Sequence, residues 1–186
     1  MPYSVQAIQP KDGEIFVKFM ESVSFSHAPH WSECYCRFYH CEDAEIWKQR
    51  TAKENRAEAL GAIKDGSMRG YLAYDSDKII GWCNANNLEA YHLLKPELSP
   101  IIKDQKTGVV ICFLIHNEYQ SQGVARMLLD AAILGFRNEG YDAVIAMPVD
   151  VDVPEKRYRG TLNMYQERGF IPEEHDDISL MRLALH

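Results

Sequence analysis

The chain has 186 residues, of which 46% are hydrophobic and 25% charged, and its formal net charge is −7. This size and balance predict one soluble globular domain that covers residues 1–186, with an elaborated segment at about 24–69. The negative charge and the lack of a run of lysines and arginines argue against nucleic acid as a partner.

No apolar run in the sequence reaches the roughly 20 residues that a membrane span requires, and the first residues lack the pattern of a signal peptide. We therefore expect no membrane partner and a cytoplasmic location. In that compartment cysteines are expected to be reduced, and an odd number of them also argues against a complete disulfide framework. The five cysteines are Cys34, Cys36, Cys41, Cys83 and Cys112.

The N-terminal half begins with an alternating stretch at 3–8 that predicts a short strand. Apolar residues at helical spacing predict a helix at about 13–23. An irregular piece rich in aromatic residues, His and Cys follows at 24–41. A polar, helix-forming stretch then runs from about 42 to 64. Two β-rich runs at 70–85, joined by the turn residues at 75–77, predict a hairpin.

The C-terminal half begins with a predicted loop at 86–105, followed by an apolar run at 108–115 that is typical of a fully covered central strand. A helix is predicted from about 122 to near Gly140 and a second buried strand at 141–149. The remaining elements are a short helix at 161–169 and a final strand at 177–185. This order predicts an α/β or α+β fold in which a meander precedes a βαβ unit.

Residues 120–125, QSQGVA, lie where the strand at 108–115 is followed by the amphipathic helix. The first turn of a helix leaves about four backbone N–H groups unpaired, and the helix dipole adds partial positive charge there. A diphosphate can dock on those groups if no side chain blocks it, which would explain Gly123 and the small Ala125, with Arg126 adding a charge-assisted bond. The alternative is a tight turn that packs closely.

Gln120, Gly123 and Ala125 match the Q/R-x-x-G-x-G/A signature of the GCN5-related N-acetyltransferase (GNAT) superfamily, which this chain resembles. GYLAYDSDKIIGW is similar to the hairpin of that family, NMYQERGF to its late helix and the MRLAL ending to its last strand. These features occur in the order of the family over roughly residues 70–185. The resemblance implies a GNAT-like mixed, mostly antiparallel central sheet with a βαβ acyl-CoA-binding unit and flanking helices.

The resemblance also implies an enzyme, an acetyl-CoA-dependent N-acetyltransferase that acts on a primary amine of a small molecule or peptide. Tyr165 aligns with a tyrosine that in many members protonates the departing CoA thiolate, the alternative being a buried aromatic residue that only packs. Homodimers are frequent in the superfamily, so a homodimer is the default expectation. The implied cofactor-binding residues are Phe113, Leu114 and Ile115 beside the pantetheine arm, and Gln120, Ser121, Gln122, Gly123, Val124, Ala125 and Arg126 around the pyrophosphate.

Acetyl transfer requires a neutral amine, so a proton must be removed from the acceptor. The sequence does not identify the base. Asp150 and Asp152 follow the second buried strand and could face the acceptor, or they could be exposed carboxylates of a loop. The acidic chain together with the aromatic residues would suit a cationic acceptor, through charge and cation–π contact. These aromatic residues are Trp31, Tyr35, Tyr74 and Trp82.

The segment 27–41 gathers six side chains that zinc favours, but it lacks the usual spacer between pairs of ligands. We therefore predict no metal and expect the segment to line the acceptor pocket or to pack under it. Its C-x-C pattern resembles an uncharacterised subset of the superfamily, which does not name the substrate. Two other functions stay open: a non-catalytic acyl-CoA-binding or regulatory module on the same fold, and a zinc-binding protein. The six side chains are His27, His30, Cys34, Cys36, His40 and Cys41.

Overall fold

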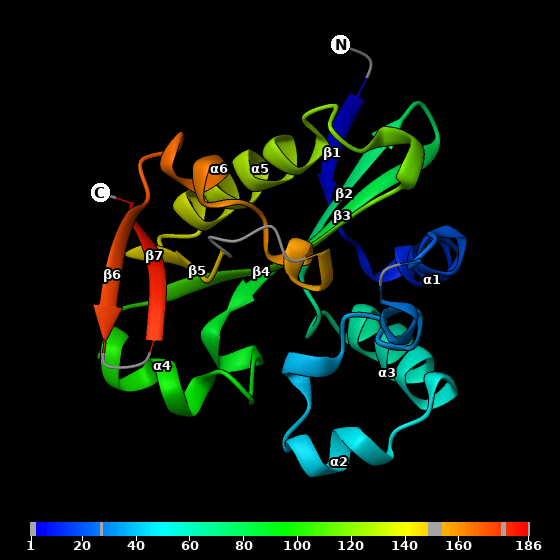
Figure 1. Ribbon diagram of the computed structural model, residues 1–186, viewed down its shortest axis with the longest axis horizontal. Helices are drawn as coiled ribbons and strands as arrows, with labels where there is room; N and C mark the ends of the chain where they lie inside the picture. The colour runs from blue at the N-terminus through cyan, green and yellow to red at the C-terminus, as the bar shows by residue number, and fades with distance from the viewer. Residues whose placement is uncertain (1–2, 27, 149–153, 176–177, 186) are drawn as a thin grey trace.

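The structure is a computed structural model that describes residues 3–26, 28–148, 154–175 and 178–185. A seven-stranded sheet crosses it in the order β1-β2-β3-β4-β5-β7-β6 (Figure 1). Only β4 and β5 are parallel, and every other neighbouring pair is antiparallel. This confirms the expected mixed, mostly antiparallel sheet. The strands are β1 (Tyr3–Ala7), β2 (Gly70–Asp75), β3 (Lys78–Asn87), β4 (Thr107–Ile115), β5 (Ala143–Ala146), β6 (Ile171–His175) and β7 (Ile178–Ala184).

Helices cover both faces of this sheet. The apolar sides of α5 and α6 pack on one face, while α1 and α3 cover the β2–β3 half of the other face and α4 covers its β4–β7 half (Figure 1). The face covered by α5 and α6 therefore has one hydrophobic core. The other face has two, one under α1 and α3 and one under α4. The helices are α1 (Gly13–Ser22), α2 (Ala44–Gln49), α3 (Ala52–Asp65), α4 (Lys95–Ile102), α5 (Val124–Asn138) and α6 (Leu162–Gln166).

The single helix expected at 42–64 is two helices, α2 and α3. The chain is extended at Arg50 and Thr51, and Thr51 then starts α3 with a capping box. Its side chain accepts from the backbone N–H of Glu54, whose carboxylate accepts from the N–H of Thr51. This reciprocal pairing satisfies helix-terminal donors and makes Thr51 a better start than an interior residue.

Two elements were missed by sequence analysis. The predicted loop at 86–105 contains α4. Pro96 lies in the first turn of this helix, where a backbone N–H would have no partner within the helix, so its absence in proline loses no hydrogen bond. The strand β6 pairs with β7 at the edge of the sheet, and its residues are mostly exposed. The β6 sequence, IPEEH, shows no apolar alternation, so the periodicity that located the other strands is absent there.

The strands β4 and β5 diverge within the sheet. They pair from Thr107 with Ala143 to Val110 with Ala146. Beyond Val110, β4 continues to Ile115 and pairs with β3 alone among the described strands, while the 3₁₀ helix η6 (Pro154–Arg159) packs beside it. One edge of β4 therefore carries backbone groups that β5 does not pair, in the middle of the sheet.

Candidate active site

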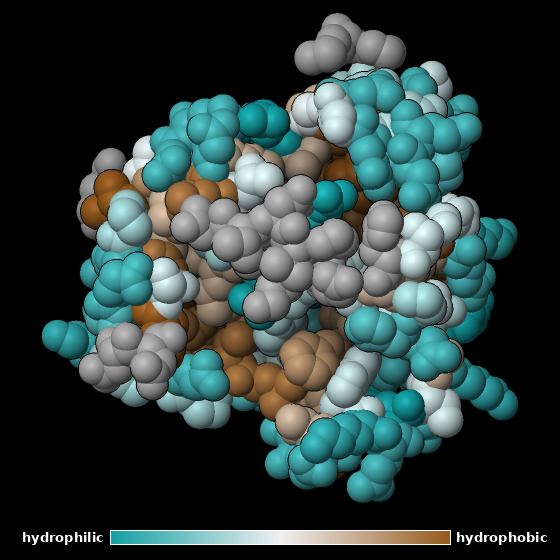
Figure 2. All heavy atoms as spheres, viewed as in Figure 1, coloured by the Kyte–Doolittle hydropathy of each residue, from teal (hydrophilic) through white to brown (hydrophobic). Residues whose placement is uncertain are grey.

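A cavity of about 510 Å³ lies against the diverging part of β4. This volume is within the range of small-molecule sites. Ile111, Cys112, Phe113 and Leu114 form its β4 wall. Figure 2 shows apolar side chains gathered in the hollowed front of the molecule between α4 and α2. A substrate in this cavity would lie beside the free edge of the central strand.

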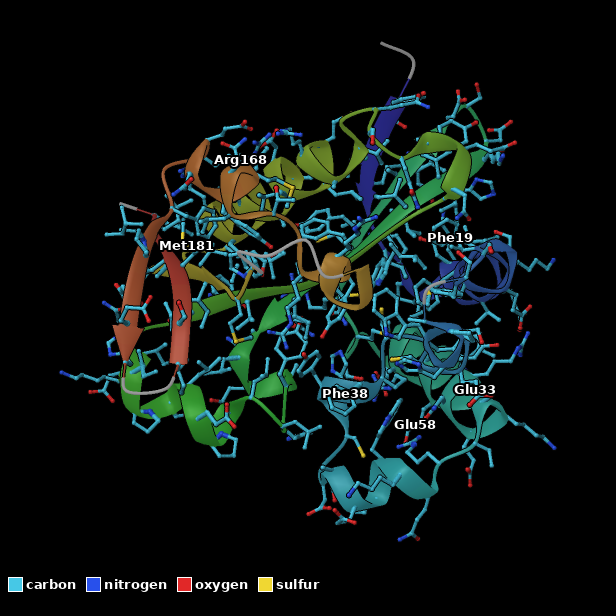
Figure 3. All side chains as sticks on the ribbon, in the orientation of Figure 1. Phe19, Glu33, Phe38, Glu58, Arg168 and Met181 are labelled. Atoms are coloured by element: carbon cyan, nitrogen blue, oxygen red, sulfur yellow. The ribbon has the colours of Figure 1, made fainter. Side chains whose placement is uncertain are left out.

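The opposite wall belongs to the elaborated N-terminal segment. It is built by the 3₁₀ helix η2 (Pro29–Glu33), the 3₁₀ helix η3 (Phe38–His40) and the α2 helix. In Figure 3, Glu33 and Phe38 lie on this side, below α1 and near α3. Sequence analysis expected this segment to line the acceptor pocket or to pack under it, and its residues do line the cavity. Those that do so include Phe25, His30, Trp31, Glu33, Cys34, Cys36, Phe38, Tyr39, Trp47, Lys48 and Arg50.

A buried hydrogen-bond network connects this segment to β3. The amide nitrogen of Asn84 lies 3.4 Å from the backbone oxygen of Cys36 and 3.2 Å from Nε2 of His40, and its oxygen accepts from the Tyr91 hydroxyl at 2.9 Å. Nδ1 of His40 lies 2.8 Å from the carbonyl oxygen of Ala90, which only a protonated nitrogen can contact favourably. His40 is therefore the neutral Nδ1–H tautomer, and burial lowers its pKa to about 3.

The sulfur of Cys36 sits between two polar neighbours. It accepts from the indole N–H of Trp82 at 3.2 Å and shares a hydrogen bond with Cys112, whose Sγ atom is 3.6 Å away. The bond to Cys112 lowers the pKa of Cys36, although burial acts in the opposite sense. The backbone of Cys36 is left-handed, with φ of 55°, a conformation that is uncommon outside glycine. The thiol is therefore held in a defined place in the cavity wall.

The QSQGVA loop leads into the N-terminus of α5. Gly123 has φ of 82° and precedes α5 without a side-chain cap, so the first N–H groups of the helix are open to a ligand. A Cβ at Gly123 would meet no described atom within 4 Å. Close packing therefore does not require the glycine, although its left-handed backbone by itself accounts for a glycine at this turn. Its left-handed backbone and the space beside it both suit an anion that approaches the helix N-terminus.

The side chains of this loop are already engaged. Gln122 donates to the carbonyl of Glu118 at 2.7 Å and accepts from the Tyr3 hydroxyl at 2.8 Å, which holds the loop against β1. Arg126 forms a two-pronged ion pair with Glu167, at 2.9 and 3.2 Å. The expected bond from Arg126 to a phosphate would have to replace this ion pair. The side chain of Val124 is buried in the core, so only its backbone could contact a cofactor.

The remaining predicted cofactor residues differ in their surroundings. Phe113 and Leu114 line the cavity, whereas Ile115 lies opposite Gly81 of β3 and is outside the described lining. Gln120 and Ser121 are exposed in the loop, and Ala125 packs against the core of α5. The predicted residues therefore form two groups, one at the free edge of β4 and one at the start of α5.

Tyr165 is fully buried and donates to the carbonyl of Arg159 at 2.9 Å. Burial raises its pKa well above the ordinary value, so the phenol keeps its proton. Its ring packs edge-to-face on Phe170, with the ring centres 5.1 Å apart. A role as proton donor would require the hydroxyl to leave the Arg159 carbonyl.

The four aromatic residues expected at the acceptor lie in different places. Tyr35 is buried, donates to Glu21 at 3.2 Å and is outside the described lining. Trp31 lines the cavity. Trp82 is fully buried against Phe16, with its N–H on Cys36, and is outside the described lining. Tyr74 packs beside the core of α1 and α3 and is outside the described lining. Four further aromatic residues line the cavity and were not predicted from the sequence: Phe38, Tyr39, Trp47 and Tyr158. The first three lie in or next to the segment noted for its aromatic content.

The cysteines and histidines of the N-terminal segment have separate partners. Cys41 donates to the carbonyl of Asp43, while His40 and Cys36 belong to the network described above. Within the described residues, no group of three or more His, Cys, Asp or Glu could hold a metal ion. His27, Asp150 and Asp152 lie outside the described residues. No helix among the described residues is long and apolar enough to cross a membrane.

Comparisons with known proteins agree with this arrangement. Residues 28–170 match the acetyltransferase (GNAT) family, whereas no curated protein matches the chain in sequence. A GNAT-family acetyltransferase from Streptococcus pneumoniae has a similar structure, with 17% identity, 99% of each chain covered and a TM-score of 0.55. A Salmonella typhimurium protein described as an acetyltransferase, solved with its cofactor acetyl-CoA, is 13% identical over 100% of this chain and 95% of its own, with a TM-score of 0.57.

A Drosophila melanogaster polyamine N-acetyltransferase is also similar, with 12% identity, 98% of this chain and 100% of its own covered, and a TM-score of 0.56. At these identities the structural likeness shows the fold alone. The family match covers most of the chain, and it shows that this protein belongs to the GNAT acetyltransferase family. It is thus an acyltransferase, and acetyl-CoA is the acyl donor of its family. The resemblance noted in the sequence is confirmed.

Proposed function

We propose that the protein is an acetyl-CoA-dependent N-acetyltransferase that transfers the acetyl group to a primary amine of a small molecule or peptide. The observation that carries this proposal is the cavity along the part of β4 that no described strand pairs on the side of β5, with an uncapped helix N-terminus after the same strand. The acyl donor and the acceptor must meet where the acetyl group is transferred. The cavity gives an acceptor access to the diverging part of β4 from the side of the elaborated segment.

The chemistry of the residues present fits acetyl-CoA. The first N–H groups of α5, beside Gly123, are suited to the pyrophosphate. The free edge of β4 at Phe113 and Leu114 offers backbone groups for the amides of the pantetheine arm. When bound, acetyl-CoA supplies a thioester whose carbonyl carbon is attacked by the amine nitrogen, with the CoA thiolate as the leaving group. An unpaired N–H on β4 would stabilise negative charge on the carbonyl oxygen.

Tyr165 is the proposed source of the proton that the CoA thiolate requires. The phenol stays protonated over the working pH range, so its proton is available, although burial also makes it a weaker acid. The hydrogen bond to Arg159 gives the hydroxyl a resting partner, which it would exchange for the sulfur. The acceptor amine must lose a proton in the same reaction, to solvent or to a base.

The test is a calorimetric titration of the protein with acetyl-CoA beside the Gly123→Trp variant. The Cβ of residue 123 points to open space, so the indole would cover the helix N-terminus. We expect binding by the unmodified protein and its loss in the variant. A Gly140→Trp variant controls for an added indole and for the strain of replacing a left-handed glycine, since Gly140 has φ of 67° and open space around its Cβ position.

Two results would count against the proposal. Absence of binding by the unmodified protein would rule out acetyl-CoA as the donor. Tight binding without release of CoA in the presence of any amine would favour the non-catalytic acyl-CoA-binding module instead.

A further inference from the structure

We infer that the acceptor is a monoamine with an apolar, aromatic-sized body, and that it is neither a polyamine nor a polyhydroxylated amine. This inference rests on the proposed function and names the substrate class of the same cavity. It follows from three properties of the cavity walls: their aromatic rings, the prior engagement of their hydroxyl groups and their balance of charges.

The cavity is surrounded by half-buried aromatic rings, which come mainly from the elaborated segment. Trp31 meets Tyr158 edge-to-face with ring centres 5.0 Å apart, and Phe38 meets Trp47 at 5.4 Å. These contacts brace the rings before any ligand enters. An apolar body gains by leaving water for such a surface, and a ring gains further from edge-to-face contact. The six residues are Phe25, Trp31, Phe38, Tyr39, Trp47 and Tyr158.

The hydroxyl groups of the cavity already have partners. The hydroxyls of Tyr39 and Tyr158 lie 3.1 Å apart, and the Arg159 guanidinium donates to both, at 3.0 and 3.1 Å. This three-residue network connects the elaborated segment to the chain that precedes α6. A ligand with many hydroxyl groups would have to break it or leave its own groups unpaired, and both are unfavourable in a buried site. The walls therefore disfavour a sugar-like acceptor.

The charges of the lining match one ammonium group. Glu33 is the one carboxylate among the described lining residues, and no described residue forms a hydrogen bond or ion pair with that carboxylate. Its backbone oxygen accepts from Asn55 at 2.8 Å, which fixes its place on the wall. The cations of the lining are already paired: Arg50 with Glu58 at 2.6 Å and Lys48 with Glu45 at 2.6 Å.

Among the described lining residues, a second ammonium on the acceptor would find no carboxylate besides Glu33 and would meet Lys48 and Arg50. The net charge of −7 therefore does not describe the cavity, where the lining holds one acidic and two basic side chains. A single ammonium can pair with Glu33 and contact the aromatic rings, as cations do on the faces of Trp and Tyr. These properties separate a monoamine from a polyamine.

The test measures amine binding directly, so it does not depend on turnover. The protein, saturated with CoA or without it, is titrated calorimetrically with 2-phenylethylamine and with spermidine. We expect 2-phenylethylamine to bind at least tenfold more tightly. Equal or tighter binding of spermidine, or no binding of 2-phenylethylamine, would overturn the inference.

Two variants identify the walls that carry the effect. Trp31→Ala should weaken 2-phenylethylamine binding at least tenfold, with Trp31→Phe restoring most of it. Glu33→Gln should weaken it about fivefold, as expected for one partly exposed ion pair. The matched controls are Ile171→Ala and Glu97→Gln, exposed and outside the lining, which should leave binding unchanged. Equal losses for 2-phenylethylamine and spermidine in Trp31→Ala would also contradict the inference.

Failure of the inference can be distinguished from failure of the proposed function. If acetyl-CoA binds and spermidine is the preferred amine, the function stands and the substrate class is wrong. If 2-phenylethylamine binds as expected but acetyl-CoA does not, the cavity is an amine site and the transfer reaction is wrong.

Discussion

The sulfur atoms of Cys36 and Cys112 lie 3.6 Å apart in the cavity wall, and the indole of Trp82 donates to Cys36 from β3. When Cys36 ionises, both neighbours can donate to its thiolate, which explains why its pKa is lowered even though it is buried. Two residues earlier, burial raises the pKa of the Cys34 thiol to about 12. Two cysteines in one short segment therefore have thiol pKa values shifted in opposite directions.

We expect iodoacetamide to modify Cys36 at a lower pH than Cys34, because the thiolate is the reactive form. Mass spectrometry of the modified peptides over a pH series measures both profiles. In Cys112→Ala the profile of Cys36 should move to higher pH, since the largest cause of the lowered pKa is removed. Cys41→Ala is the control, and an unchanged Cys36 profile in Cys112→Ala would contradict the explanation.

His40 makes stability depend on pH. Its pKa is about 3 in the folded protein, mainly through burial, and about 6.5 in an unfolded chain. Between these values the unfolded state binds the extra proton, so His40 contributes stability that is fully present above pH 6.5 and is lost as pH falls towards 3. The slope from this residue is at most about 1.4 kcal/mol per pH unit. Urea unfolding between pH 7.5 and 4.5 measures it.

The variant His40→Gln should flatten this pH dependence, because a glutamine does not titrate. His92→Gln removes a histidine from an exposed position and should keep the slope of the unmodified protein. Equal slopes in all three proteins would show that His40 does not control the stability in acid.

Tyr165→Phe should lower kcat about a hundredfold while leaving KM for the amine nearly unchanged, if the hydroxyl protonates the leaving thiolate. The same change removes the bond to Arg159, at a stability cost of about 1 kcal/mol. Steady-state kinetics and thermal unfolding measure the two effects separately. Tyr165 itself is outside the described cavity lining, and Tyr141→Phe, at another buried tyrosine of the same core, is the control. A normal kcat in Tyr165→Phe would leave Tyr165 as a packing residue.

Asn55→Ala should destabilise the protein by about 1–3 kcal/mol in urea unfolding. Asn55 is buried, donates to the carbonyl of Glu33 at 2.8 Å and accepts from Arg50 at 2.8 Å, so its loss leaves two groups without their partner. Lys53→Ala, exposed on the same helix, should change stability by less than about 0.5 kcal/mol. A matching small effect in Asn55→Ala would show that water replaces both bonds.

Sequence periodicity located two kinds of element: helices with apolar residues along one side, such as α5, and strands covered on both faces, such as β4. It failed where local patterns are weak or where a cap decides the outcome. The division at Thr51 depends on a reciprocal bond with Glu54, and α4 has a proline in its first turn and a second one in its interior. The QSQGVA motif was recognisable because the conformation of Gly123 is a local property of a helix start.

The sequence by itself determined the family, the central strand with its following helix, and the position of the loop at the start of α5. These depend on residues that are close along the chain. Only the tertiary structure decided which aromatic residues meet in the cavity, that Trp82 is buried while Trp31 is not, and that Arg126 is paired with Glu167. Such contacts join residues far apart in sequence, as between Trp31 and Tyr158, and their partners are fixed only when the elements pack against one another.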